Sequence, residues 1–348
     1  MNQAGEKLFV EEIREGREVV SAFLFDDLRL GQTRGGKPFV GLKLKDRTGS
    51  MEARVWDDAL KFFDSFSNGD VVLVKGSAES FQGKIQIKVT QAQTVSPDQI
   101  DYSYFLPASP YDVEEMFAEL LSLVRGVADP DLRALLEDIL GDTDLASRLK
   151  RAPAAKRFHH AYIGGLLEHT LAVTRAAAAL SLLYPALHRD LLLAGAVIHD
   201  LGKVREFDLG ISGDYSDEGR LLGHIVLGVE MVEKRLAARP DFPPDLALLL
   251  KHLIASHHGE QGFGSPKRPK ILEALALHHL DDLDAKINGI GGFIERHVDE
   301  RTGWTDYNRL MERFFYRPEL PVFESPKEKE NRKPAAKADP NQLSLLDD

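Results

Sequence analysis

Apolar and polar positions alternate along much of the first hundred residues of the chain. Five short runs carry this pattern and are rich in β-branched and aromatic residues, at 19–25, 39–45, 51–56, 71–78 and 84–89. An alternation of period two predicts strands that bury one face, and glycine-containing turns separate the runs. One helical patch, at 58–66, falls between the third and fourth runs. We therefore expect residues 16–97 to form a small all-β domain.

From about residue 109 to residue 315, apolar residues recur at helical spacing instead. Ser109-Pro110-Tyr111-Asp112 combines an N-cap, a proline and a first-turn acid, Asp129-Pro130 repeats the signal, and Gly141 predicts a helix end. Further helices are expected at 161–183, 191–198, 224–238 and 245–258 and from 271 onward. No strand series interrupts this pattern, so the second domain is predicted to be all-α.

The remaining segments divide the chain. Residues 1–15 form an N-terminal extension, 98–150 a linker and helical connection, and 151–316 the main helical domain. From about residue 325 the chain is rich in lysine, glutamate, proline and alanine, so 317–348 is predicted to be a disordered tail. Three leucines reappear near its end, which is typical of a short docking peptide on a tether.

Composition limits the number of domains, the cellular compartment and the kinds of partner to be expected. The 348 residues suffice for two or three domains, and the absence of cysteine excludes disulfides and thiolate metal sites, as expected for a cytoplasmic protein. No apolar run approaches the roughly 18 residues of a membrane span, so no membrane partner is expected. A net charge of −11 argues mildly against nucleic acid, but residues 31–94 carry ten basic and seven acidic residues, a local charge of +3.

The order of the strands resembles a known fold. Five strands with a helix after the third resemble the OB-fold, and the segment 39–56 is similar to the central hairpin of OB domains that bind nucleic acid. This resemblance implies that bases stack on exposed aromatics and that phosphates lie near basic residues, the candidates being Phe39, Trp56, Phe81, Lys43, Arg54 and Lys84. Alternatively, the aromatics fill the barrel and the lysines only solvate it.

A second basic cluster precedes the first histidine pair of the helical domain. Its members are Lys150, Arg151, Lys156 and Arg157, just ahead of His159-His160. Such a run is usually a solvated helix face, but Lys156 and Arg157 are also candidates for guiding a phosphate toward the helical domain.

The candidate chemistry centres on His199-Asp200, which ends an apolar helical run and is followed by Gly202 and Lys203. Neutral imidazole and carboxylate are both ligands of divalent metals. His169 lies in an apolar helix, where a single histidine is more often a hydrogen-bonded core residue. His169 is a candidate ligand only because further residues of ligand type accompany it, namely His224, His257, His258, Asp281 and Asp284. Five helices thus each contribute histidine or aspartate, and a shared site for Mn, Fe, Mg, Zn or Co explains this most simply.

These residues also carry a family resemblance. The order His169, then His199-Asp200, then a later aspartate resembles the HD-domain phosphohydrolases, and His224 with His257-His258 resembles the subset that binds two metals. More narrowly, the motifs at 159–170, 199–203, 223–225, 256–259 and 280–286, placed after an OB-fold, are similar to the YhaM-type 3′-to-5′ exoribonuclease family. The resemblance covers about residues 16–316.

The resemblance implies a ligand set. Two divalent ions, manganese first, are expected: one at His169, His199, Asp200 and Asp281, the other at Asp200, His224, His257 and His258. Asp281 precedes a spaced leucine and alanine, as the last ligand does in related HD proteins, so Asp284 is kept as its substitute. Lys203 is a candidate catalytic cation beside Asp200, or an ordinary lysine at a helix C-terminus.

The implied activity is 3′-to-5′ hydrolysis of single-stranded RNA, with DNA as a second substrate, to nucleoside 5′-monophosphates. Two other functions stay open: hydrolysis of small nucleotides, and nucleic-acid binding with a vestigial metal site. In the tail, Gln342, Leu343, Leu345 and Leu346 resemble peptides by which bacterial replication and repair proteins bind the sliding clamp, with Leu346 in place of an aromatic residue. Alternatively, these leucines pack on the protein's own surface.

Overall fold

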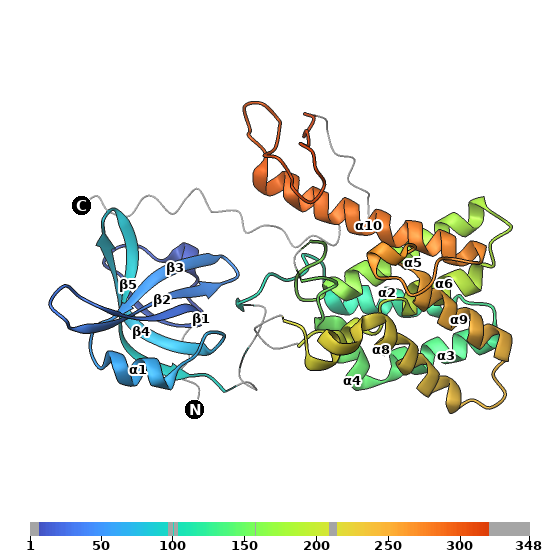
Figure 1. The fold of residues 1–348 in the computed structure, drawn as a ribbon, viewed down its shortest axis with the longest axis horizontal. Coiled ribbons are helices and arrows are strands. Elements are labelled where there is room, and N and C mark those ends of the chain that lie inside the picture. The colour runs from blue at the N-terminus through green and yellow to red at the C-terminus, as the bar shows by residue number, and fades with distance from the viewer. Residues whose placement is uncertain (1–6, 97–99, 101–103, 157, 209–213, 320–348) are drawn as a thin grey trace, which may run out of the picture.

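The computed structural model describes residues 7–96, 100, 104–156, 158–208 and 214–319. Figure 1 shows the strands gathered in an N-terminal barrel and the long helices in the C-terminal part of the chain. The predicted phosphate contact Arg157 and the predicted docking peptide at 342–346 lie outside the described residues.

The N-terminal domain is a closed five-stranded barrel in the order β1-β2-β3-β5-β4. Its pairs are antiparallel except for β3 with β5, which is parallel. Inward-facing apolar residues such as Phe23, Leu42 and Ile87 are fully buried and fill the barrel. The elements are β1 (Glu18–Gln32), β2 (Pro38–Asp46), β3 (Gly49–Val55), α1 (Ala59–Ser65), β4 (Val71–Phe81) and β5 (Lys84–Thr94). The predicted strand series and the position of its helix are confirmed, and this is the OB-fold.

The C-terminal domain is helical, and three aspartates cap the starts of its first helices. Asp112, Asp129 and Asp142 each accept hydrogen bonds from two backbone N–H groups of the following turn, which satisfies donors that a helix start otherwise leaves free. The helices are α2 (Val113–Arg125), α3 (Pro130–Gly141), α4 (Thr143–Arg151), α5 (Gly165–Leu183), α6 (Arg189–Ile198), α7 (Lys203–Glu206), α8 (Asp217–Ala237), α9 (Pro244–Ser256) and α10 (Leu272–His297).

Helix α5 lies at the centre of this domain and contacts α2, α4, α6 and α10. By length and composition it could cross a membrane, so the expectation that no apolar run approaches that length was wrong. However, it buries Leu166, His169 and Val173 against the other helices of the domain. Its apolar character is therefore that of a core helix.

Several boundaries differ from those predicted. Helix α2 begins at Val113 and is capped by Asp112, not by Ser109. Helix α5 begins at Gly165 because Gly164 adopts a left-handed φ of 79°, which ends the loop before it. Helix α8 is broken at Gly223, whose φ of 72° is not helical. Helix α10 ends at His297, and residues 298–316 form a bridged segment with isolated β-bridges between Val298 and Thr305 and between Trp304 and Tyr316. The expectation of helix as far as residue 315 was wrong, because Gly303, at a φ of 73°, turns the chain back on itself.

Candidate metal centre

Four side chains from α5, the end of α6 and α10 converge on one point. The Nε2 atoms of His169 and His199 are 3.2 Å apart, and Asp200 Oδ2 lies 3.5 Å and 3.4 Å from them. Asp281 Oδ1 lies 3.1 Å from His169 Nε2. These ligand atoms all lie within 4.8 Å of one another, close enough to bind one ion.

A second group lies on the other side of Asp200. It consists of His224, His257 and His258, whose ligand atoms also lie within 4.8 Å of one another. Asp200 Oδ1 lies 3.5 Å from His257 Nε2 and 3.6 Å from His224 Nε2. Asp200 thus directs one carboxylate oxygen toward each group.

Four of these histidines are held in the orientation that a ligand needs. In each ring Nδ1 faces a hydrogen-bond acceptor, so that the proton lies there and the Nε2 lone pair faces the centre. The acceptors are Asp284 Oδ2 for His169 (2.7 Å), the Ala196 carbonyl for His199 (2.8 Å), Glu206 Oε1 for His224 (3.0 Å) and the Ile254 carbonyl for His257 (2.8 Å).

The residues present fit a divalent cation. Asp200 Oδ1, His224 Nε2 and His257 Nε2 are buried and lack a hydrogen-bond partner within the described part of the chain. Each such atom costs about 1–3 kcal/mol when left unsatisfied, and a bound cation would remove that cost. All the ligand atoms are nitrogen or oxygen, which suits Mn, Fe, Mg, Zn or Co.

The charges of the site also suit a cation. Burial alone would raise the pKa of Asp200, but Lys203 and His199 outweigh it and hold that pKa well below its usual range. The pKa of Asp281 is lowered too, against the effect of burial, mainly by its hydrogen bond with His169. Burial and the neighbouring His257 and His224 lower the pKa of His258 to about 4. The carboxylates are therefore ionised and His258 is neutral near pH 7, the forms in which they bind metal.

Lys203 lies within this centre. Its Nζ is buried and lies 2.6 Å from Asp200 Oδ2, so it is no ordinary exposed lysine at a helix end. The preceding Gly202 permits this position, because a Cβ there would lie 1.9 Å from the backbone oxygen of His224. Only glycine lets α7 pass so close to α8.

The two candidate aspartates of α10 occupy different places. Asp281 lies on the Nε2 side of His169, inside the ligand group. Asp284 contacts the opposite nitrogen of that ring and also lies 2.9 Å from His160 Nε2. This geometry favours Asp281 as the ligand and Asp284 as the residue that holds His169 in place.

Several supporting residues escaped the sequence analysis. Glu206 accepts hydrogen bonds from both the backbone N–H and the ring of His224. Behind Asp284, His160 contacts Tyr162, whose hydroxyl donates to Glu168. In the sequence, only the histidine doublet at 159–160 and the acid at 206 point to these residues. Neither shows which side chain His160 or Glu206 contacts in the folded chain.

On the barrel, three predicted contacts lie together. The rings of Phe39 and Trp56 are 5.2 Å apart, and the Arg54 guanidinium lies 5.5 Å from the Phe39 ring. Gly41 makes room for Arg54, since a Cβ there would lie 2.1 Å from its Nη1. Neither Phe39 nor Trp56 belongs to the barrel core, so the alternative that they fill the barrel was wrong.

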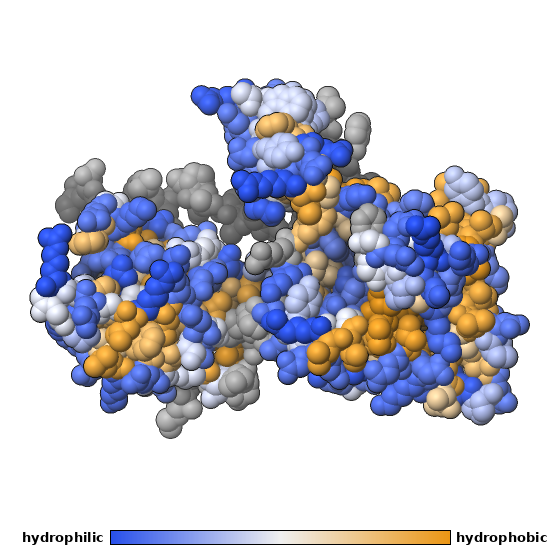
Figure 2. Space-filling model, viewed as in Figure 1, coloured by the Kyte–Doolittle hydropathy of each residue, from blue (hydrophilic) through white to orange (hydrophobic). Residues whose placement is uncertain are grey.

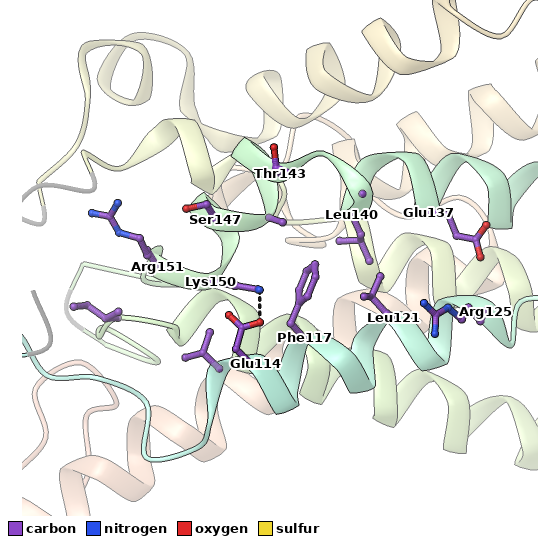
Figure 3. Close-up of a pocket in the computed structure, with 14 residues that line it drawn as sticks. Glu114, Phe117, Leu121, Arg125, Glu137, Leu140, Thr143, Ser147, Lys150 and Arg151 are labelled. Atoms are coloured by element: carbon purple, nitrogen blue, oxygen red, sulfur yellow. Dashed lines mark hydrogen bonds and ion pairs between the residues drawn. The ribbon is translucent and has the colours of Figure 1, made fainter. Parts of the chain in front are cut away.

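The other predicted contacts are dispersed. Phe81 and Lys84 are exposed and pair with each other where β4 meets β5, while Lys43 lies 3.6 Å from Asp27. In the helical domain, Lys156 pairs with Asp214 at 2.7 Å. Lys150 pairs with Glu114 at the edge of a cavity of about 880 Å³ between α2, α3 and α4, which none of the predicted metal ligands lines (Figure 3).

Comparisons with known proteins support the assignment of both domains. The HD domain model matches residues 166–286, and the model of an OB-fold nucleic acid binding domain matches residues 19–95. Proteins named 3′-5′ exoribonuclease YhaM are 34% identical in Geobacillus sp., over 87% of this chain and 93% of that protein, and 33% identical in Bacillus subtilis, over 87% and 96%. The chain belongs to the YhaM family. The Listeria welshimeri member is 37% identical over 78% of this chain and 86% of its own length, so the likeness to YhaM proteins extends over both domains.

Among solved structures, the second OB-fold domain of replication protein A from Methanococcus maripaludis matches 26% of the chain and 96% of that domain, at 18% identity and a TM-score of 0.22. The OB-fold of residues 19–95 rests on its strand order and on the family model.

Proposed function

We propose that the chain is a metal-dependent 3′-to-5′ exonuclease that degrades single-stranded nucleic acid, RNA in preference to DNA, to nucleoside 5′-monophosphates. The observation that carries the proposal is Asp200, which directs one oxygen into each of two ligand groups. Membership of the YhaM family and an OB-fold ahead of the HD domain support the same activity.

The proposal includes two ions, manganese first. His169, His199, Asp200 and Asp281 would hold one, and Asp200, His224, His257 and His258 the other. Ions bound in this way activate a water molecule and neutralise charge on the phosphoryl oxygens.

The protein's own residues position and polarise the reacting groups. Lys203 holds Asp200 through Oδ2 and supplies positive charge where negative charge develops on the phosphate. Asp284 and Glu206 fix the rings of His169 and His224, so that both Nε2 atoms are already oriented before a ligand arrives. No side-chain nucleophile is required for this reaction.

The barrel would hold the strand. Phe39 and Trp56 offer stacking surfaces to bases, and Arg54 lies beside them for a phosphate or a base plane. Lys43 and Lys84 are further phosphate contacts, and the second basic cluster contributes Lys156 on the helical domain.

The test uses the full chain with 5′-labelled single-stranded RNA and DNA, each with Mn, Mg, Zn or a chelator. We expect stepwise shortening from the 3′ end with release of 5′-mononucleotides, faster on RNA, and none with the chelator. Hydrolysis of free nucleotides without shortening would instead indicate a small-molecule phosphohydrolase. Strand binding without any hydrolysis would indicate a vestigial site.

For the tail we propose a separate partner, the bacterial sliding clamp, bound through Gln342, Leu343, Leu345 and Leu346. A peptide of residues 338–348 is titrated against purified clamp. Saturable micromolar binding that is lost when Leu343 and Leu345 are replaced by alanine supports the proposal, and no binding at high micromolar clamp refutes it.

A further inference from the structure

One buried histidine nitrogen beside the metal centre has no partner in the chain. Among the residues that the structure describes, four buried side-chain nitrogen or oxygen atoms lack a hydrogen-bond partner. Three of them belong to the predicted metal ligands Asp200, His224 and His257, and the fourth is Nδ1 of His159. Because a buried polar atom without a partner costs free energy, this atom indicates that a bound group completes the site at His159 as well.

The His159 ring lies beside the ligand group that includes His169. The centroids of these two rings are 5.6 Å apart, and the ring planes are inclined at 56°. The charges of Lys203, Asp200 and Asp281 also act on the His159 ring. However, His159 belongs to none of the groups whose ligand atoms lie within 4.8 Å of one another. It is therefore placed to contact a molecule bound at the ions rather than the ions themselves.

The neighbouring His160 shows how a purely structural histidine is held in this loop. Both of its ring nitrogens have partners, the Tyr162 hydroxyl at Nδ1 and Asp284 at Nε2, each 2.9 Å away. His159 has no hydrogen bond at either ring nitrogen within the described part of the chain, and of the two only Nδ1 is among the buried unpartnered atoms. A structural role explains the orientation of His160, but it leaves the buried nitrogen of His159 unexplained.

The loop before α5 fixes His159 from both sides. The Phe158 ring packs on α10 at Gly289, where a Cβ would lie 2.6 Å from it. Figure 2 shows hydrophobic surface where α10 leaves the helical body, so an apolar anchor suits this helix. On the other side, His160 adopts a left-handed φ of 44°, and its backbone N–H donates to Asn288 Oδ1 at 2.7 Å. A left-handed conformation is strained for a residue other than glycine, and such strain is found mainly at functional sites.

We propose that His159 is a catalytic residue whose imidazole donates a hydrogen bond, through Nδ1, to an oxygen of the scissile phosphate. The hydrogen bond would stabilise the negative charge that develops on that phosphate. A neutral imidazole has one N–H donor, so His159 can make this contact without being a metal ligand. The inference rests on the proposed hydrolysis of phosphodiester bonds, because it places the substrate's phosphate at the predicted ligand groups.

The test measures the binding of adenosine 5′-monophosphate to the Mn-loaded full chain by calorimetry. His159→Leu should weaken this binding about 10–100-fold, since a hydrogen bond to a charged oxygen is lost, and turnover of a dinucleotide should fall about 100-fold. His159→Asn, whose amide N–H takes the place of Nδ1, should recover most of both losses. The affinity for Mn, measured by equilibrium dialysis, should match wild type in both variants. His279→Leu, which changes an exposed histidine of α10, is the control.

Each alternative role for His159 gives a different result. Binding of the monophosphate to His159→Leu that is as tight as in the control overturns the proposal. A loss of Mn affinity in His159→Leu overturns it too, because His159 would then act as a metal ligand. Equal losses in His159→Asn and His159→Leu contradict the hydrogen bond. If His159→Leu fails to fold, His159→Gln replaces it, since its amide reaches the position of Nε2 instead, and it should bind as weakly.

The outcome can be told apart from that of the proposed function. A wild-type chain that binds the monophosphate through His159 but does not shorten single strands would refute the exonuclease activity and leave the phosphate contact standing. A wild-type chain that shortens strands, with a His159→Leu variant that does so equally fast and binds the monophosphate equally well, would refute only the role of His159.

Discussion

The helical centre and the barrel surface use polar residues in opposite ways. In the helical domain, His169, His199 and Asp200 are almost completely buried, and other groups orient them within a few ångströms of one another. On the barrel, Phe39, Arg54 and Trp56 are partly exposed and rest on one another. The first arrangement is rigid and intolerant of change, as chemistry requires, while the second is adaptable, as binding of many sequences requires.

The largest effect is expected at Asp200, where the two halves of the centre meet. Asp200→Ala should lower turnover by at least about 1,000-fold, because both ligand groups lose an oxygen and Lys203 loses its partner. Strand binding should be nearly unchanged. Single-turnover rates and binding titrations measure both. Asp282→Ala is the control, because the Asp282 side chain is 43% exposed and pairs with Lys286. Turnover of Asp200→Ala equal to that of the control would refute the metal assignment.

The next effect tests whether holding the His169 ring in place matters as much as supplying a metal ligand. Asp284→Asn should lower metal affinity or activity by about 10–100-fold, since a neutral amide oxygen accepts the Nδ1–H of His169 more weakly than a carboxylate does. The apparent Mn affinity, read from activity against Mn concentration, is the measurement. If saturating Mn restores full activity, Asp284 positions His169 for binding alone; if Asp284→Asn matches wild type at all concentrations, this residue has no such role.

Substitutions on the barrel should weaken strand binding and leave the hydrolysis step unchanged. Phe39→Ala with Trp56→Ala should raise KM for long single strands by about 10–100-fold, the loss of about 1–3 kcal/mol for one base stacked on this ring pair, and leave kcat on a dinucleotide unchanged. Phe81→Ala, at an exposed hairpin end, should have a smaller effect. Equal losses on long strands and dinucleotides would mean that the barrel does not act through strand capture.

The smallest effect is expected far from both regions, at Asp142, which caps α4 and pairs with Arg235 of α8. Its loss should lower the free energy of unfolding by about 1 kcal/mol at pH 7 and leave activity unchanged. Hydrogen bonds from the Leu145 N–H and from Arg235 lower the pKa of Asp142, so its charge stabilises the fold above about pH 4 and ceases to do so as pH falls below that.

Urea unfolding at several pH values measures this difference. The gap between wild type and Asp142→Ala should narrow on acidification below about pH 4, whereas Asp142→Asn, which keeps a cap but no charge, should lie between them at pH 7. A gap that does not depend on pH would show that the capping geometry, and not the charge, stabilises this helix.

The sequence predicted those features that local chemistry determines. Asp129 marks a helix start because a side-chain acceptor is needed there, and His199-Asp200 stands out because it ends a buried helix. The start near 109–112 was also predicted, but Asp112 and not Ser109 is the capping residue. Glu206 and His160 could not be assigned, since their partners His224 and Asp284 are brought to them only by tertiary packing. The segment after His297 was misjudged because closely spaced aromatics fit both helical and extended periodicity.

The central claim is that Asp200 is shared by two metal ions. Crystals of the Mn-loaded full chain, measured at the Mn absorption edge, test it most directly. We predict two anomalous peaks about 3.5–4 Å apart, one beside Asp200 Oδ2 with His169 and His199, the other beside Oδ1 with His224 and His257. A single peak, or two peaks of which only one contacts Asp200, would contradict the account.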